Sequence, residues 1–249
     1  MEPNYKEAFL WEPGKGKTML GTLGGKTSVT LGMNNRGQII GVSSLASGGL
    51  CAFLWDKAAG MKELSAPEGN GFWPTSISDA GQILVTYPDR QSLFDPNGPI
   101  SLKTLPPKTW LHTMNRRFCM AGIEKPIGPT WYLVLWDERK TLRRLVPANN
   151  EHATRLNDKN QIAYTEFRRN RRKELEDRYI RRRFDLDETV SYLWDPARRR
   201  VPLNRYVCDM ERFHVMDLNN NGCIIGQGEM KDGSTRSVLL EPIPGRWGR

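Results

Sequence analysis

The sequence predicts an all-β fold, a β-propeller of about five four-stranded blades. Three observations predict it: a tight-turn pattern that recurs five times, a Leu-Trp strand pattern that alternates with it, and a spacing near forty residues between copies. The 249 residues include 23 Gly and 16 Pro, which suits many short strands joined by tight turns. No run approaches eighteen apolar residues, so no membrane-spanning helix is predicted.

The turn pattern predicts a hairpin in each copy. It consists of an aliphatic residue, Asn or Ser, two variable residues, a turn residue that is usually Gly, a polar residue and a second apolar run. Asn and Asp hydrogen-bond to their own backbone, and Gly adopts positive φ freely. Asn160 can replace Gly, whereas Phe118 is poorly suited to positive φ, so the third turn is expected to differ in shape. The copies span residues 33–41, 77–84, 114–122, 156–163 and 218–226.

The second pattern reads apolar-Leu-Trp-Asp/Glu and predicts a further strand in each repeat. Its aromatic residue is expected to fill the core between neighbouring blades, where each ring buries on the order of 150–250 Å². The pattern occurs six times against five turns. An open or six-bladed array is therefore the alternative to a ring of five. The aromatic residues are Trp11, Trp55, Phe94, Trp136 and Trp194.

The spacing of the turns supports a propeller and predicts one insertion. The turn residues Gly37, Gly81, Phe118, Asn160 and Gly222 are separated by 44, 37, 42 and 62 residues. Removing about twenty residues from the last gap restores the period that is typical of propeller blades. An irregular β-sandwich also has many short strands, but five copies in phase favour the propeller. We expect one repeat domain, 1–249, with a basic insertion at 167–190.

Three segments carry a resemblance to a known repeat family. They are Ala8-Phe9-Leu10-Trp11, Leu20-Gly21-Thr22-Leu23-Gly24-Gly25 and the turn from Met33 to Gly41. Together they resemble the HAF repeat of the "probable extracellular repeat" proteins. The resemblance covers most of the chain and implies a β-propeller-like fold, frequent export and no established activity. The chain is short for that family and shows no signal peptide, so as written it is expected to be cytoplasmic.

The net charge of +9 is concentrated in the insertion. Residues 168–183 contain nine Lys/Arg and three Asp/Glu, which leaves +6 in this segment. Such runs are usually solvated loops, but they can also bind phosphate or an acidic polymer. A short helix and an extended hairpin are both compatible with its pattern. The candidate anion-binding residues are Arg168, Arg169, Arg171, Arg172, Lys173, Arg181, Arg182 and Arg183.

One repeated position carries candidate ligand-binding residues. Four residues before the aliphatic residue of each turn stand Trp73, Trp110, His152 and His214, with Val29 in the first copy. Aromatic and imidazole side chains at one repeated position could form a ring near one mouth of a propeller. Packing between blades is the simpler explanation for them.

The sequence contains no recognisable catalytic or metal-binding motif. It has no Gly-x-Ser-x-Gly elbow, no His-Glu-x-x-His and no cysteine pair with zinc spacing. We therefore expect no enzyme, no cofactor and no metal, but a scaffold that binds an unknown protein or glycan. A carbohydrate hydrolase or lyase of propeller fold, which needs paired carboxylates, and an anionic-polymer binder are the alternatives. Nucleic acid is not expected as a partner, because acids interrupt the basic run and aromatic residues do not interleave it.

Overall fold

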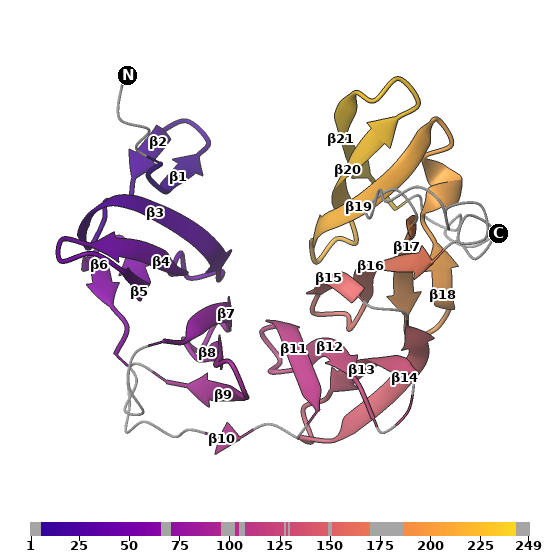
Figure 1. Ribbon diagram of the computed structural model, residues 1–249, viewed down its shortest axis with the longest axis horizontal. Coiled ribbons are helices and arrows are strands. Elements are labelled where there is room, and N and C mark those ends of the chain that lie inside the picture. The colour runs from indigo at the N-terminus through magenta and orange to yellow at the C-terminus, as the bar shows by residue number, and fades with distance from the viewer. Residues whose placement is uncertain are drawn as a thin grey trace, which may run out of the picture. The chain divides into compact units, whose positions relative to one another are not determined.

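The computed structural model describes residues 6–65, 71–95, 103–104, 108–126, 128, 130–148, 151–169 and 187–242. In these residues the chain consists of antiparallel β-sheets and one short 3₁₀-helix, η2 (Asn204–Tyr206) (Figure 1). The strands group into two compact units, residues 1–107 and 108–249. The prediction that residues 1–249 form a single repeat domain stays a prediction.

The first unit contains a hairpin and two four-stranded sheets, each a simple up-and-down meander. The N-terminal hairpin pairs β1 (Phe9–Glu12) with β2 (Gly16–Met19). Sheet 1 is formed by β3 (Gly24–Met33), β4 (Ile39–Leu45), β5 (Leu50–Asp56) and β6 (Gly60–Glu63). Sheet 2 is formed by β7 (Trp73–Ile77), β8 (Ile83–Thr86), β9 (Gln91–Phe94) and β10 (Lys103–Thr104).

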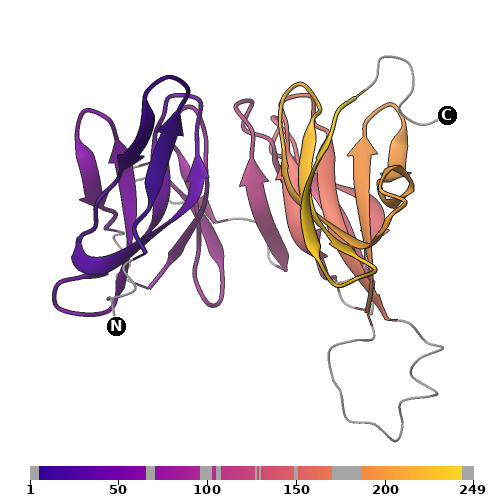
Figure 2. The same ribbon diagram turned by 90° about the horizontal axis from the view of Figure 1, so that it is seen from above.

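The second unit contains three sheets with the same meander topology, and Figure 2 shows their strands from a second direction. Sheet 3 is formed by β11 (Thr109–Met114), β12 (Met120–Glu124), β13 (Trp131–Trp136) and β14 (Leu142–Ala148). Sheet 4 is formed by β15 (Glu151–Leu156), β16 (Ile162–Arg169), β17 (Asp187–Asp195) and β18 (Arg199–Pro202). Sheet 5 has three strands, β19 (Met210–Leu218), β20 (Ile224–Met230) and β21 (Thr235–Leu240).

The two ends of the basic insertion continue the strands of sheet 4. Phe167 pairs with Thr189, Arg168 with Glu188 and Arg169 with Asp187. The base of the insertion is therefore an extended hairpin, one of the two conformations that its sequence allows. Residues 170–186 lie outside the described residues.

The five predicted turns join the first two strands of the five sheets, and all share one geometry. In each turn, the backbone amide of the first polar residue donates to the carbonyl four residues later. The backbone amide of the turn residue donates to the carbonyl of that first polar residue. The turn residue has positive φ in every copy, including 64° at Phe118 and 58° at Asn160. The expectation that the Phe118 turn differs in shape is therefore wrong. The hydrogen bonds of the hairpin impose the left-handed conformation on Phe118, at a cost of roughly 1–2 kcal/mol.

A change at one of these turns tests the cost of positive φ directly. Gly37 has φ 77°, and a Cβ built on it meets no atom within 4 Å. We expect Gly37→Ala to lower the free energy of unfolding by about 1 kcal/mol through backbone strain alone, as urea unfolding would measure. Gly37→Asn is the control and should lose less, because Asn tolerates this conformation. Equal losses in the two variants would contradict this explanation.

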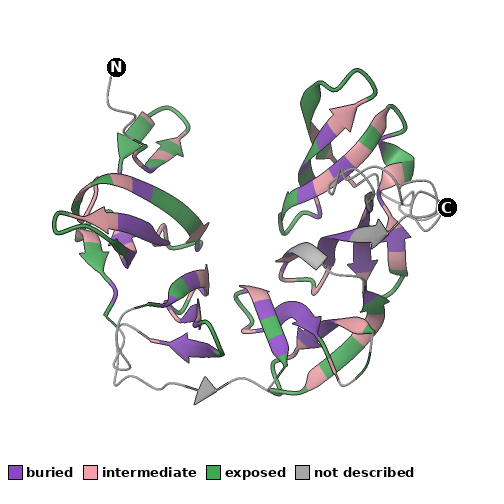
Figure 3. Cartoon of the chain, in the orientation of Figure 1, coloured by how far each residue is buried: buried purple, intermediate pink, exposed green. Residues whose placement is uncertain are grey.

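Apolar clusters between successive sheets form the core of each unit (Figure 3). One cluster joins sheets 1 and 2, a second joins sheets 3 and 4, and a third joins sheets 4 and 5. Trp55, Phe94 and Trp194 are buried in clusters against the preceding element, which confirms the predicted role of these aromatic residues.

Two aromatic residues of the same pattern behave differently. Trp136 is only half-buried. Trp11 is 63% exposed, so its predicted place in the core is wrong. The other members of the pattern pack against the element that precedes them, and among the described residues no sheet precedes β1 and β2.

A ladder of hydrogen bonds connects neighbouring turns across the sheets of each unit. The side-chain Nδ2 of Asn34 donates to the carbonyl of Ser78 at 2.9 Å. Asn115 donates in the same way to Asn157 at 3.0 Å, and Asn157 donates to Asn219 at 3.1 Å. The repeated Asn therefore closes its own turn with its oxygen and binds the next turn with its amide.

The residue after that Asn forms a second line of the same ladder. Asp79 Oδ1 accepts from the backbone N of Asn35 at 2.9 Å, and Asp158 Oδ1 accepts from that of Arg116 at 3.1 Å. The backbone N of Asp158 in turn donates to Asn220 Oδ1 at 2.9 Å. The polar pair in the turn motif thus carries contacts between blades, which turn chemistry alone does not predict.

Candidate functional site

The structure presents the tryptophans of the repeated ligand-binding position to solvent. Trp73, at the start of β7, is 50% exposed, and Trp110, on β11, is 41% exposed. His214 on β19 is half-buried and lies opposite Gln227. His152 lies on β15, but its side chain is outside the described residues.

The described contacts do not assemble these residues into one cluster. Trp73 belongs to the first unit, and Trp110, His152 and His214 belong to the second. The aromatic contact described for Trp110 is with Trp131, which lies outside the repeated position. A ring made of all four side chains therefore stays a prediction.

The predicted anion-binding residues fall mostly outside the described part of the chain. Arg168 and Arg169 belong to β16, where their backbones pair with those of Glu188 and Asp187 in β17. The remaining six, Arg171, Arg172, Lys173, Arg181, Arg182 and Arg183, lie outside the described residues. Their role stays a prediction.

The best-formed exposed constellation is a tryptophan platform on sheet 3, made of Trp110, Trp131 and Lys125. The indoles of Trp110 and Trp131 come from β11 and β13, on either side of β12, and their ring centroids are 6.3 Å apart at 42°. Lys125 follows β12 directly, and its Nζ lies 4.8 Å from the centroid of the Trp131 ring. Its backbone amide donates to the carbonyl of Lys108, which fixes the end of β12 beside the start of β11.

The other face of the same end of sheet 3 carries an ion pair. Arg144 donates to both carboxylate oxygens of Glu124, at 2.6 and 2.8 Å, and its guanidinium lies 5.4 Å from the Tyr132 ring centroid. The hydrogen bond from Arg144 lowers the pKa of Glu124. At neutral pH the Glu124 side chain is therefore a carboxylate, able to accept hydrogen bonds but unable to donate a proton.

Sheet 4 carries a related pair at the equivalent position, in a more buried setting. Glu124 and Glu166 each follow the first Asn of their turn by nine residues. The Glu166 side chain is 1% exposed and lies 2.5 Å from Arg200, which is a quarter exposed. The Arg200 guanidinium lies 3.7 Å from the ring centroid of Tyr192, so the pair is held against an aromatic face.

The Arg200 side chain also reaches sheet 3. Its Nη1 donates to the carbonyl of Pro147 at 3.5 Å, and Pro147 pairs with Tyr132, the residue next to Trp131. The buried pair of sheet 4 therefore contacts β14, the strand that pairs with β13 and its Trp131.

The sequence prediction found Trp110 but missed the residues around it. Trp131 and Lys125 do not occupy the repeated position that Trp110 shares with Trp73, His152 and His214. They come close to Trp110 only when β11, β12 and β13 pair. The sequence did contain a signal for Glu124 and Glu166, because each follows the first Asn of its turn at the same distance.

Two further findings apply to the described residues. No group of three or more His, Cys, Asp or Glu there is arranged to hold a metal ion. In the same part of the chain, no helix has the length and apolar character needed to cross a bilayer.

The fold is similar to that of solved propeller proteins. TolB from Acinetobacter baumannii matches with a TM-score of 0.52 and 12% identity over 76% of this chain, which spans 46% of the TolB chain. A gluconolactonase from Xanthomonas campestris matches with a TM-score of 0.46 and 10% identity, over 93% of this chain and 82% of that one. A proposed 6-phosphogluconolactonase from Bacteroides uniformis matches with a TM-score of 0.41 and 13% identity, over 94% and 78%. No family model and no curated protein matches the sequence.

These similarities correct the prediction that the chain is not an enzyme. Two of the three similar structures are a gluconolactonase and a proposed 6-phosphogluconolactonase. The missing catalytic motifs in this sequence therefore do not exclude an activity. At 10–13% identity the likenesses assign no substrate and no residue role to this chain.

The fold class that the sequence predicts is confirmed by the likeness to TolB and by the five meander sheets that contain the predicted turns. Membership of the HAF repeat family stays a prediction. The chain is an all-β protein with the fold of a five-bladed β-propeller.

Proposed function

We propose that this propeller binds a saccharide on the tryptophan platform of sheet 3. The observation that carries the proposal is a pair of indoles at the surface, Trp110, which is 41% exposed, and Trp131, which is half-buried, with ring centroids 6.3 Å apart beside Lys125. By contrast, Trp55 and Trp194, which belong to the Leu-Trp pattern of other sheets, are buried in the core. Indoles left in water give up that hydrophobic stabilisation, and exposed apolar surface of this kind is common at ligand sites.

The chemistry of the platform suits a sugar ring. One face of a pyranose presents C–H groups that can lie against an indole, while its hydroxyls stay in water. Lys125 Nζ, held 4.8 Å from the Trp131 ring centroid, can donate hydrogen bonds to ligand oxygens at the edge of the platform. Two tilted indole faces with one cationic donor beside them thus suit a ring that has an apolar face and a polar rim.

Alanine substitutions on the platform test this proposal. Trp110→Ala and Trp131→Ala are each expected to weaken binding of the saccharides selected on a glycan array by about tenfold or more, because each removes a stacking surface. Isothermal titration calorimetry with the best array ligand measures the change, and mass spectrometry of the same mixtures records whether the ligand is converted.

Trp11→Ala is the matched control. Trp11 is also exposed, but it lies on the N-terminal hairpin of the first unit and is not part of the platform, so this variant should bind as the unmodified protein does. Absence of selective binding on the array would refute the proposal. Equal losses in the Trp11 and Trp110 variants would do the same.

A further inference from the structure

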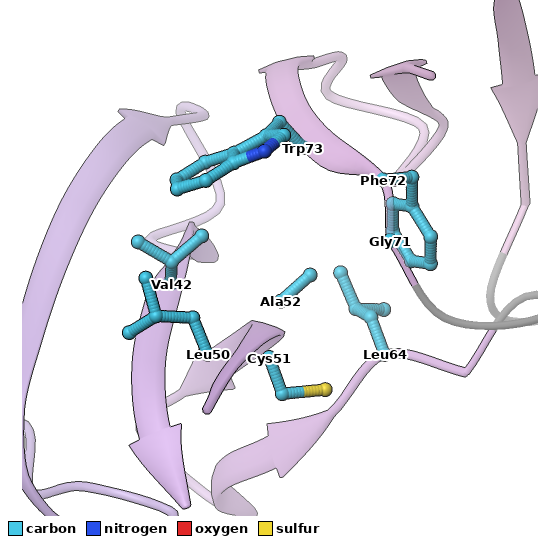
Figure 4. Close-up of a pocket in the computed structure, with 8 residues that line it drawn as sticks. All are labelled: Val42, Leu50, Cys51, Ala52, Leu64, Gly71, Phe72 and Trp73. Atoms are coloured by element: carbon cyan, nitrogen blue, oxygen red, sulfur yellow. The ribbon is translucent and has the colours of Figure 1, made fainter. Parts of the chain in front are cut away.

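The first unit contains a separate hollow between sheets 1 and 2. This cavity has a volume of about 70 Å³, and it opens beside Trp73. Figure 4 shows the Trp73 indole reaching over Val42 and Leu50, with the Phe72 ring on the other side and Cys51 at the base. The lining residues are Val42, Leu50, Cys51, Ala52, Leu64, Gly71, Phe72 and Trp73.

The walls of the cavity are apolar and buried, while its mouth is apolar and exposed. Val42, Ala52, Leu64 and Phe72 are all buried. Leu50 is 59% exposed and stands at the opening with the half-exposed Trp73. The buried apolar side chains give an apolar ligand group surface to contact out of water.

Cys51 keeps its part of the lining neutral. Its thiol donates a hydrogen bond to Glu63 Oε1 at 3.1 Å. Burial, with the Glu63 carboxylate second, raises the pKa of Cys51 to about 11. The thiol is therefore protonated at neutral pH and presents a small apolar surface rather than a charge.

The position of Trp73 is the second observation that points to a ligand. Trp73 and Trp110 occupy the same place in their repeats, four residues before the aliphatic residue of the turn, and both are exposed. At Trp73 the exposed indole borders a cavity of about 70 Å³, which is roughly twice the 30 Å³ or so that one water molecule occupies in the liquid. An indole face beside a narrow apolar hole fits a ring that carries a short side group.

We propose that this site binds a small planar ring compound with a short alkyl substituent. The alkyl group occupies the cavity between sheets 1 and 2, and the ring lies on Trp73. The site shares no residue with the tryptophan platform of sheet 3. It therefore does not depend on saccharide binding there.

A series of 4-alkylphenols tests the fit of the alkyl group to the cavity. Phenol, 4-methylphenol, 4-ethylphenol, 4-propylphenol and 4-hexylphenol are titrated into the full chain and followed by two-dimensional NMR. The affinity is expected to rise about fourfold for each methylene that enters the cavity. It should stop rising beyond propyl, because the longer chain no longer fits. An affinity that does not change with the length of the alkyl chain, or that continues to rise from propyl to hexyl, would overturn the proposal.

Two substitutions connect the effect to this cavity. Ala52→Val fills part of the hollow and should abolish the gain from methyl to propyl, whereas Trp73→Ala should weaken all members of the series. Val42→Ile serves the same purpose if Ala52→Val does not fold. Ala8→Val, a buried alanine in a different cluster of the same unit, is the matched control and should keep the chain-length dependence.

The control for the other site keeps the two proposals distinguishable. Trp110→Ala should leave alkylphenol binding unchanged, and Trp73→Ala should leave saccharide binding on sheet 3 unchanged. Alkylphenol binding that is lost in Trp110→Ala but kept in Trp73→Ala would assign the ligand to sheet 3 and overturn the cavity proposal.

Discussion

Replacing Arg200 by methionine is expected to lower the free energy of unfolding by about 3 kcal/mol. Breaking a buried ion pair costs roughly 3–5 kcal/mol, because the remaining charge has no partner in a medium of low dielectric constant. Arg200 is a quarter exposed, which places the loss toward the lower limit. Chemical denaturation at neutral pH measures it.

The reason for this loss is the burial of Glu166 rather than the attraction between the two charges. The Glu166 side chain is 1% exposed, whereas methionine can replace much of the packing of Arg200 on Tyr192. Arg200→Met combined with Glu166→Gln removes the unpaired charge and should recover part of the stability.

The control for this prediction lies on β14. Arg143→Met changes an exposed arginine to the same residue and should stay within about 0.5 kcal/mol of the unmodified protein. If Arg200→Met were as mild as Arg143→Met, Glu166 would not depend on its partner in the way described.

The second large effect is expected at the centre of the turn ladder. Asn157→Asp should lower the free energy of unfolding by about 2 kcal/mol, because two partly buried acceptors lose the amide that donates to them, at roughly 1 kcal/mol each. These acceptors are Gln161 Oε1, at 2.8 Å from Asn157 Nδ2, and the carbonyl of Asn219, at 3.1 Å. Asn157 is 2% exposed, so water cannot replace the lost amide.

The same substitution should make the loss of stability smaller at acidic pH than at neutral pH. The new carboxylate would face two acceptor oxygens, which favours its protonated form in the folded state over the unfolded state. The loss should therefore be full at neutral pH and shrink as the solution is acidified. Thermal unfolding at pH 7 and at pH 4 compares the two conditions.

Asn221→Asp is the matched control for the ladder. Asn221 lies in the fifth turn and is exposed, and only its backbone amide takes part in the turn's hydrogen bonds. This variant should lose little stability at either pH. A comparable loss in both variants would mean that a general charge effect, and not the ladder, causes the change.

Part of the candidate site was predictable because it depends on repeat position. Trp73 and Trp110 stand out by their equal distance from the turn, and both are exposed in the structure. The platform around Trp110 could not be predicted in the same way. Trp131 reaches Trp110 only because β12 lies between their two strands, and that arrangement depends on pairing rather than on any local pattern.

The burial of the pattern aromatics shows the same limit. Trp11 and Trp55 occupy equivalent places in the Leu-Trp pattern, yet Trp11 is 63% exposed and Trp55 is buried. The side chains are identical, but Trp55 packs against the N-terminal hairpin, whereas no sheet precedes Trp11 among the described residues. A pattern can predict which face of a strand is apolar, but not whether a neighbour covers that face.

The sequence by itself determined the five turns, the strands that flank them and the fold class, since hairpin chemistry acts between residues a few positions apart. The tertiary structure alone decided the amide ladder and the Glu166–Arg200 pair. The ladder joins residues 42, 44 or 62 positions apart, and the Arg200 partner lies 34 residues from Glu166. Such contacts form only after separate strands have paired and stacked, so no local preference in the chain can encode them.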